Sequence, residues 1–203
     1  MLDDQERRQV ARQRGRPWVI GKAGMSRNGC LTRPPGEGTW ITSEAARQDV
    51  QRLRAACDAV LVGAETARKD NPRLTVRDFT VPRQPWRVIL SRSGNLPAEL
   101  CVLTDEHRSR TLICADDKPE VFWSCLRDHG VEVLLVEGGG RVLDDWAGKG
   151  WIDEVVIYEA PFDLQGEGLV KAERFRLLLN HSDEVEELWI GEDRRISGRV
   201  RMV

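Results

Sequence analysis

The clearest indication of the fold is the sequence Leu134-Leu-Val-Glu-Gly-Gly-Gly-Arg-Val-Leu143. An apolar run leads into three glycines, and a helical pattern follows at once with Val142, Leu143 and Trp146 on one face. Strands that are apolar on consecutive residues are typical of a parallel sheet covered on both faces. The glycines either bring the backbone close to a ligand, for which the first amides of a helix favour a pyrophosphate, or form a plain tight connection. The stretch therefore predicts an α/β fold and leaves the ligand open.

The alternation of strand and helix extends along the chain and predicts one α/β domain. We expect strands over 18–25, 59–63, 87–90, 111–114, 131–137 and 154–158, and a final pair at about 187–191 and 199–203 around a polar turn, Glu192-Asp-Arg-Arg195. Ser43 is the expected N-cap of a helix through Cys57, and Pro119 is expected to begin a helix that stops before Gly130. We predict a single domain over 16–203, with a mostly parallel central sheet flanked by helices and antiparallel C-terminal strands. Residues 1–15 are predicted to be an exposed helical or frayed arm.

Charge and cysteine content exclude several classes of protein. The 203 residues contain 31 basic and 33 acidic side chains, so no global field favours nucleic acid or an anionic membrane. The five cysteines form no C-x-x-C pair, which argues against a zinc ribbon or a dithiol centre. The start of the chain is too polar for a secretory signal, and no apolar run reaches the roughly 18 residues of a membrane span. We expect a cytoplasmic protein without a bound metal.

Several polar residues stand where a ligand would bind. Glu137 closes a strand at its carboxyl end, where open α/β sheets bind ligands, although it could also anchor a loop. Thr66 and Asp70 follow another strand, four residues apart. Arg54 and Arg77 could converge on a phosphate, or they could be solvated surface arginines. The H-x-E and P-C-x-x-C motifs of zinc nucleobase deaminases are absent, as is the G-x-G-x-x-G dinucleotide fingerprint.

Nine matching segments occur in one order over most of residues 17–161. They are Lys22-Ala-Gly-Met-Ser-Arg-Asn-Gly29, Trp40-Ile-Thr-Ser43, Ala46-Arg-Gln-Asp-Val-Gln-Arg-Leu-Arg54, Asp58-Ala-Val-Leu-Val-Gly63, Thr66, Asp70-Asn-Pro-Arg-Leu-Thr75, Val136-Glu-Gly-Gly139, Ile152-Asp-Glu154 and Tyr158-Glu-Ala-Pro161. In this order they resemble the reductase domain of the bifunctional riboflavin-biosynthesis deaminase–reductase and its stand-alone pyrimidine reductase relatives.

The resemblance implies a dihydrofolate-reductase-like fold, NADPH as the hydride donor and a homodimer. It implies a ribosylaminopyrimidine 5′-phosphate as substrate, whose ring-opened sugar is reduced to a ribitylamino group. By position, the residues implied to contact the substrate are Arg54, Leu74, Arg77 and Glu137. Those implied to contact the cofactor are Ala23, Trp40, Thr66, Asp70, Arg92, Gly138, Gly139, Gly140, Arg141, Val142 and Leu143. Asp70 is the first candidate for the general acid, and Lys22 is the second.

Four departures from the family pattern leave alternatives open. The family's Ser-Leu-Asp-Gly reads Ser26-Arg-Asn-Gly29, and Ser91-Arg-Ser93 stands where an Asp is common. The segment 111–137 lacks about one strand–helix unit, and the usual glycine turn after Pro161 is altered. The competing interpretations are a reductase of the same fold acting on a pterin-like or other carbonyl or imine substrate, and a catalytically idle nucleotide-binding scaffold.

Overall fold

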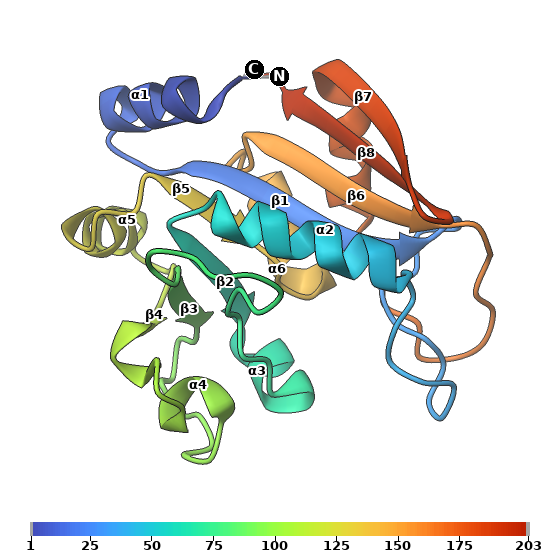
Figure 1. Cartoon of the computed structure of the whole chain (residues 1–203), viewed down its shortest axis with the longest axis horizontal. Helices are drawn as coiled ribbons and strands as arrows, with labels where there is room; N and C mark the ends of the chain where they lie inside the picture. The colour runs from blue at the N-terminus through green and yellow to red at the C-terminus, as the bar shows by residue number, and fades with distance from the viewer. Residues whose placement is uncertain (1, 202–203) are drawn as a thin grey trace. The chain divides into compact units, whose positions relative to one another are not determined.

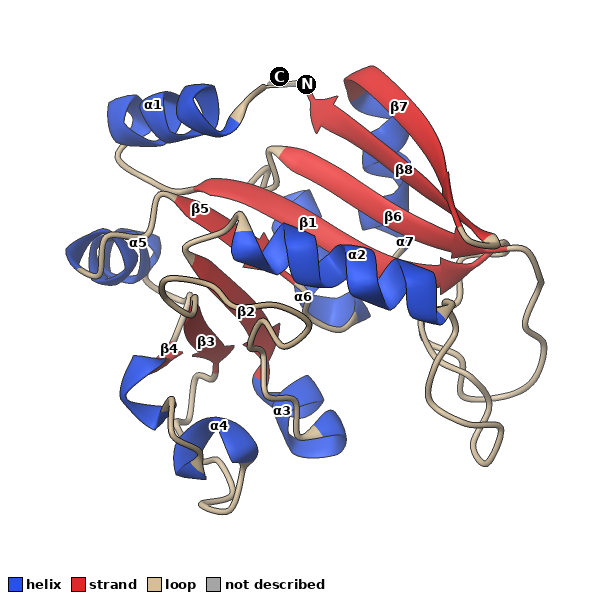
Figure 2. Cartoon of the chain, in the orientation of Figure 1, coloured by secondary structure: helices blue, strands red, loops and turns tan. Residues whose placement is uncertain are grey.

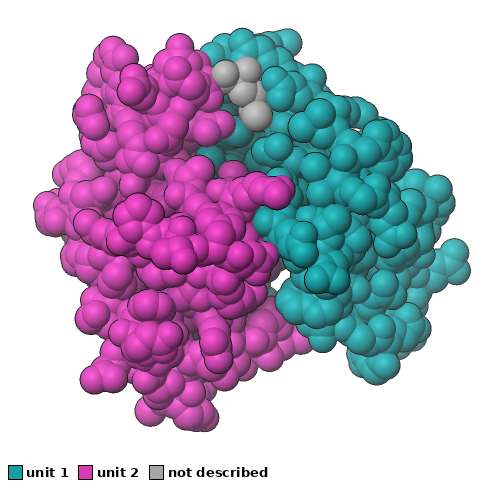
Figure 3. Space-filling model, in the orientation of Figure 1, with its two compact units in different colours: residues 1, 20–50, 140–203 teal, residues 2–19, 51–139 magenta. Residues whose placement is uncertain are grey.

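The computed structural model describes residues 2–201, and the chain divides into two compact units. Unit 1 comprises Ile20–Val50 and the chain from Gly140 onward, and unit 2 comprises Leu2–Val19 and Gln51–Gly139. Figure 3 colours unit 1 teal and unit 2 magenta. Within residues 2–201, no helix is both long and apolar enough to cross a membrane.

Unit 2 contains a parallel sheet in the order β4-β3-β2-β5 (Figure 1). Its strands are β2 (Ala59–Gly63), β3 (Trp86–Leu90), β4 (Thr111–Cys114) and β5 (Val133–Val136). Its helices are α1 (Asp4–Arg14), α3 (Ala64–Asp70), α4 (Cys101–Thr104), η1 (Arg108–Arg110) and α5 (Pro119–Asp128), with the last turn of α2 (Glu44–Ala55). Every residue of β2 and β5 is buried, which explains their continuous apolar sequence.

Unit 1 contains the antiparallel part of the fold (Figure 2). Strand β1 (Trp18–Ser26, in unit 1 from Ile20) pairs in parallel with β6 (Glu154–Ala160). β6 then pairs antiparallel with β8 (Asp193–Val200), and β8 pairs antiparallel with β7 (Ser182–Ile190). Its helices are the first turns of α2, α6 (Gly140–Gly148), α7 (Glu173–Leu177) and η2 (Leu178–His181). The predicted α/β class with antiparallel C-terminal strands is confirmed.

The C-terminal hairpin corrects one part of the prediction. The strands predicted at 187–191 and 199–203 are β7 and β8, which begin earlier and meet at a tight turn where Gly191 has a φ of +64°; residues 202–203 lie outside the described part of the chain. The predicted turn Glu192-Asp-Arg-Arg195 mostly belongs to β8. β8 pairs on both sides, so Ile196 is buried while its arginines remain partly exposed, and this polar pattern misled the prediction.

The predicted cap of α2 is confirmed. The Ser43 hydroxyl accepts a hydrogen bond from the N–H of Ala46 at 3.3 Å, and α2 ends at Ala55, slightly before the predicted Cys57. The Ser43 hydroxyl and backbone N–H also donate to one carboxylate oxygen of Asp193, at 2.6 and 2.7 Å. The start of α2 is thereby tied to the first residue of β8.

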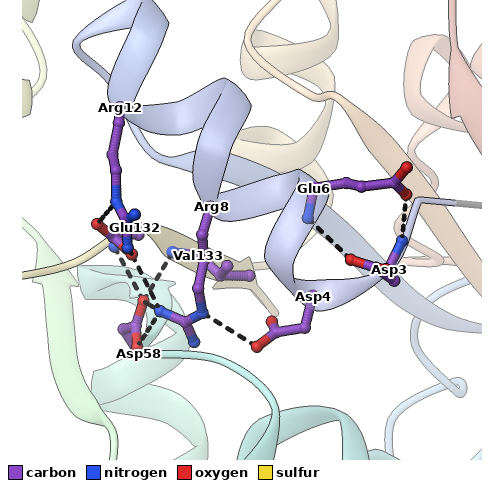
Figure 4. Close-up of polar contacts among 8 residues, drawn as sticks. All are labelled: Asp3, Asp4, Glu6, Arg8, Arg12, Asp58, Glu132 and Val133. Atoms are coloured by element: carbon purple, nitrogen blue, oxygen red, sulfur yellow. Dashed lines mark hydrogen bonds and ion pairs between the residues drawn. The ribbon is translucent and has the colours of Figure 1, made fainter.

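The N-terminal arm is the helix α1, which a capping box closes at its start. Figure 4 shows two of its arginines reaching the loops before β2 and β5. Nη1 of Arg8 donates to both carboxylate oxygens of Asp58, at 2.8 and 3.0 Å. Nε of Arg12 donates to Glu132 at 2.5 Å. Asp58 in turn accepts the backbone N–H groups of Glu132 and Val133, each at 2.9 Å, so α1 is tied to the rest of unit 2.

Candidate active site

Residues 71–77 form a loop of unit 2 with a strained centre. Leu74 is 1% exposed and has a φ of +56°. A bulky residue in this left-handed conformation costs on the order of 1–3 kcal/mol and persists only where the surroundings enforce it. The Gln84 side chain accepts from the N–H of Val76 at 2.8 Å and donates to its carbonyl oxygen at 2.9 Å. The backbone is therefore held by side chains from outside the loop.

Arg54, near the end of α2, and Glu137, the residue after β5, form a buried ion pair. Nε and Nη2 of Arg54 donate to the two carboxylate oxygens at 2.6 and 3.1 Å, and the side chains are 10% and 9% exposed. Nη1 donates to the carbonyl oxygen of Thr75 at 3.1 Å. Burial acts to lower the pKa of Arg54, but the charge of Glu137 outweighs it and the pKa is raised. The pair joins α2, the end of β5 and the strained loop.

Arg77 lies at the exposed end of the same loop. Its backbone N–H donates to Oε1 of Gln51 at 3.1 Å. Partial desolvation and the positive charge of Arg54 lower the pKa of the Arg77 guanidinium. Arginine stays charged in proteins, so neighbouring guanidinium groups favour an anion. The structure brings together in unit 2 the residues that the resemblance implies for the substrate: Arg54, Leu74, Arg77 and Glu137.

The cofactor candidates of unit 2 follow its strands along the chain, and they are Thr66, Asp70, Arg92, Gly138 and Gly139. The Thr66 hydroxyl on α3 accepts the N–H of Gly139 at 3.2 Å, and a Cβ on Gly139 would lie 3.0 Å from that oxygen. A side chain at position 139 would therefore crowd the Thr66 hydroxyl unless Thr66 shifted. Asp70 ends α3, and partial desolvation raises the pKa of its carboxyl group against the opposing charge of Lys69. Arg92 follows β3, with its side chain 73% exposed and Nε 3.9 Å from Asp116.

The second proton-donor candidate, Lys22, belongs to unit 1. It is half-buried on β1, with Nζ 5.8 Å from the ring centroid of Tyr158, whose hydroxyl donates to Asp49 at 2.7 Å. Ala23 is the next residue of β1 and is buried. Trp40 precedes α2 and is 63% exposed, with the Arg47 guanidinium 5.0 Å from its ring centroid.

The glycine turn opens α6, as predicted. A Cβ on Gly140 would lie 2.5 Å from the carbonyl oxygen of Lys171, so close packing alone requires glycine there. Arg141 is exposed, Val142 is half-buried and Leu143 is buried. Leu143 therefore offers a ligand only its backbone, because its side chain belongs to the core of unit 1.

Asn28, the most conspicuous departure from the family pattern, has a local structural partner. Its amide donates to the carbonyl oxygen of Leu164 at 2.8 Å and accepts the N–H of Leu164 at 3.1 Å. The Ser26 hydroxyl donates to the same amide oxygen at 2.6 Å. An ionised carboxylate could not donate to the carbonyl oxygen. Asn28 therefore binds the backbone of the altered segment after Pro161 through a donor that the family's Asp lacks.

Two glutamines that hold the loop were missed from the sequence. Gln51 is 4% exposed and lies three residues before Arg54, on the same face of α2. This spacing is a usable signal, because a polar residue on a buried helix face needs a partner. Gln84 stands in an irregular segment before β3 and carries no such signal.

Comparison with known proteins identifies the family of this chain. The model of the RibD C-terminal domain family matches residues 17–189. The chain belongs to this family. The riboflavin biosynthesis protein RibD of Bacillus amyloliquefaciens is 32% identical in an alignment that covers 90% of this chain. The chain spans only 57% of the length of that relative. Helix α1 precedes the part of the chain that the family model matches.

Solved structures show the same fold. A deaminase/5-amino-6-(5-phosphoribosylamino)uracil reductase from Thermotoga maritima has a TM-score of 0.75 at 24% identity, covering 93% of this chain and 58% of its own. The dihydrofolate reductase of Enterococcus faecalis, solved with NADP(H), has a TM-score of 0.56 at 11% identity, covering 90% of this chain and 96% of its own. At these identities the likeness concerns the fold alone, and it confirms the predicted dihydrofolate-reductase-like architecture.

Proposed function

We propose that this chain is an NADPH-dependent reductase of riboflavin biosynthesis that converts the ribosyl group of a ribosylaminopyrimidine 5′-phosphate into a ribitylamino group. The observation that carries the proposal is the buried Arg54–Glu137 pair beside the strained loop of Leu74 and Arg77. Membership of the RibD C-terminal domain family supports it. An idle scaffold would have no need of a strained loop and a buried ion pair at this place.

Glu137 suits the pyrimidine edge of the substrate. Each of its carboxylate oxygens accepts one hydrogen bond from Arg54, and an ionised carboxylate is an acceptor only, with about four acceptor sites. The guanidinium keeps the carboxylate charged in a buried position, where hydrogen bonds to a charged group are strong. We therefore assign Glu137 to the N–H groups of the pyrimidine and Arg54 to holding it in place.

Arg77 is the better placed ligand for the sugar phosphate. Its guanidinium is exposed, whereas Arg54 already makes three hydrogen bonds within the protein. Those bonds leave further N–H groups of Arg54 that can share the phosphate. We assign the phosphate to Arg77 first and to Arg54 second, with Leu74 packing against the substrate between them.

The residues present fit a dinucleotide cofactor. The first turn of α6, which the structure describes fully, carries no acidic residue, so its amides favour an anion. The residues that would hold the cofactor are those that the resemblance implies: Ala23, Trp40, Thr66, Asp70, Gly138, Gly139 and Gly140, the backbone of Arg141, Val142 and Leu143, and Arg92 for the 2′-phosphate. When bound, NADPH supplies the hydride. The chain's own task is to orient the sugar, exclude water and donate a proton.

Asp70 is the proposed proton donor. Partial desolvation raises the pKa of its carboxyl group, which keeps it protonated to higher pH. Lys22 is the second candidate, and its ammonium could instead stabilise negative charge. As the family resemblance implies, we also propose a homodimer in the cytoplasm.

The proposed function is tested by NADPH oxidation with purified protein. The deaminated and the undeaminated ribosylaminopyrimidine phosphate are supplied separately, with dihydrofolate as the comparison. Turnover of one pyrimidine phosphate and none of dihydrofolate supports the proposal. Turnover of dihydrofolate alone overturns it in favour of a pterin-type reductase.

A further inference from the structure

Arg87 of β3 is a charged residue buried completely inside unit 2. Its exposed fraction is 0%, although it stands in the apolar strand Trp86-Arg-Val-Ile-Leu90. Nη1 and Nη2 donate to the two carboxylate oxygens of Asp105 at 2.7 and 2.9 Å. Nε has no hydrogen-bond partner among residues 2–201. A charge buried at this cost needs a reason beyond filling the core, since apolar side chains fill a core at least as well.

The same guanidinium binds two backbone carbonyl groups. Nη1 donates to the carbonyl oxygen of Arg73 at 3.2 Å, and Nη2 donates to that of Val102 at 2.9 Å. Arg73 belongs to the loop 71–77, and Val102 belongs to α4. Arg87 therefore connects the loop 71–77 to α4.

The contact with Arg73 lies at the most strained part of the loop. Asn71 and Leu74, on either side, have φ values of +41° and +56°, two of the three non-glycine residues with positive φ among residues 2–201. The Asn71 side chain accepts the N–H of Cys101 at 2.7 Å, a second connection to α4. Strained backbone persists only where its surroundings over-determine it. A fixed carbonyl at Arg73 supplies such a restraint.

We propose that the Arg87–Asp105 pair positions the loop 71–77. The pair holds Leu74 and Arg77 in the conformation that binds the substrate. The inference rests on the proposed function, because that function gives Leu74 and Arg77 their role. Arg87 and Asp105 themselves touch no substrate; they act through the Arg73 carbonyl group. Asp105 orients the guanidinium so that its remaining N–H groups face the two carbonyl oxygens.

The competing explanation is that the pair only stabilises the fold. Two variants and a control separate the explanations. Asp105→Asn preserves shape but places an amide N–H₂ against the guanidinium. Arg87→Met combined with Asp105→Leu replaces the pair by apolar side chains, which often restores stability but offers the carbonyl groups no donor. Arg8→Ala is the control, because it removes another ion pair of unit 2 that lies outside the loop.

The first measurement is amide hydrogen exchange in the ligand-free protein, which does not depend on any activity. In Asp105→Asn and in the apolar double variant, we expect the Val76 and Arg77 amides to exchange about tenfold faster, as the loss of one charge-assisted hydrogen bond implies. In Arg8→Ala these amides should exchange as in the wild type. If exchange at both amides is unchanged in either variant of the pair, the proposal is overturned.

The second measurement is steady-state kinetics on the pyrimidine phosphate, well below the melting temperature of each variant. We expect kcat/KM to fall about tenfold in both variants of the pair, with an unchanged Kd for NADPH and wild-type kinetics in Arg8→Ala. If the double variant regains wild-type kcat/KM, the pair is structural only. If the wild type reduces no pyrimidine phosphate, the proposed function fails, and the exchange measurement still decides whether the pair positions the loop. A failure of Asp105→Asn to fold leaves both decisions to the double variant.

Discussion

Arg54 and Glu137 are 83 residues apart in sequence and are joined by two hydrogen bonds of 2.6 and 3.1 Å. The family resemblance implies each of them separately as a substrate contact. The structure makes them a single buried pair, so neither can be changed without affecting the other. Breaking such a pair from one side typically costs about 3–5 kcal/mol, because the remaining charge is left buried.

Glu137→Gln tests the pyrimidine assignment. The amide offers a donor where the pyrimidine needs an acceptor. The loss in kcat/KM for the pyrimidine substrate should therefore correspond to about 2–4 kcal/mol. The Kd for NADPH should stay within about twofold of the wild-type value, because the residues assigned to the cofactor are unchanged. Steady-state kinetics and calorimetric titration measure the two effects. Loss of NADPH binding with an unchanged KM for substrate would contradict the assignment.

Arg77→Ala tests the phosphate assignment. One charge-assisted contact is worth about 1.5–3 kcal/mol, so kcat/KM should fall about ten- to hundredfold. Arg77→Lys should restore only part of the activity, because an ammonium group cannot form the planar fork. Arg83→Ala, at an exposed arginine of the same unit, is the matched control.

The dephosphorylated substrate completes the test of Arg77. The wild type should use it poorly, and Arg77→Ala should use it no worse than the wild type does. An equal loss on both substrates would show that Arg77 has another role. Arg54→Ala should lose activity on both, because it also releases Glu137 and the Thr75 carbonyl group.

Asp70 should govern the pH dependence of the chemical step. A proton donor works only when protonated, so kcat should fall as the pH rises through the pKa of Asp70, which lies above the ordinary value of 3.8. Asp70→Asn should lower kcat about 10²- to 10⁴-fold and remove this limb of the profile. Glu65→Gln, on the same helix, is the control. If the limb survives in Asp70→Asn, Lys22 becomes the leading candidate.

Helix α1 should contribute to stability without affecting catalysis. The Arg12 side chain is 67% exposed, so Arg12→Ala should lower stability only slightly. The Arg8 side chain is 25% exposed, so Arg8→Ala should lower stability by about 1–3 kcal/mol. The hydrogen bond from Arg12 lowers the pKa of Glu132. The stabilisation is therefore complete above the unfolded pKa of about 4.3 and is lost as the pH falls through the lowered pKa. Thermal unfolding of the wild type and of Arg12→Ala across this pH range measures the stabilisation by the pair. If the difference in stability between the two proteins does not change with pH, the Arg12–Glu132 ion pair is contradicted.

The strands could be predicted because their signal is local. β2 and β4 lie at their predicted bounds, since each is a short apolar run between polar segments. The helix α3 was missed: it has only seven residues and its N-cap, Gly63, supplies no side-chain hydrogen bond. The hairpin was misplaced because β8 carries arginines whose side chains reach solvent from a paired strand.

The candidate site was less accessible to sequence reasoning, because its contacts join distant segments. The resemblance named Arg54 and Glu137, but no spacing indicates that they bind each other. Arg87 carries no signal at all, since a single arginine in an apolar strand reads as an edge or a surface position. Only the fold brings its guanidinium within hydrogen-bond distance of the Arg73 carbonyl oxygen.

The reductase activity itself is tested by the rate of NADPH oxidation by the purified chain with a ribosylaminopyrimidine 5′-phosphate, compared with the rate with NADH as the donor. If the proposed function is correct, turnover requires the pyrimidine phosphate, prefers NADPH over NADH, and falls at least about tenfold in Arg77→Ala. Equal use of the two donors would contradict the cofactor assignment at Arg92. Absence of turnover with both the deaminated and the undeaminated pyrimidine would contradict the proposed function itself.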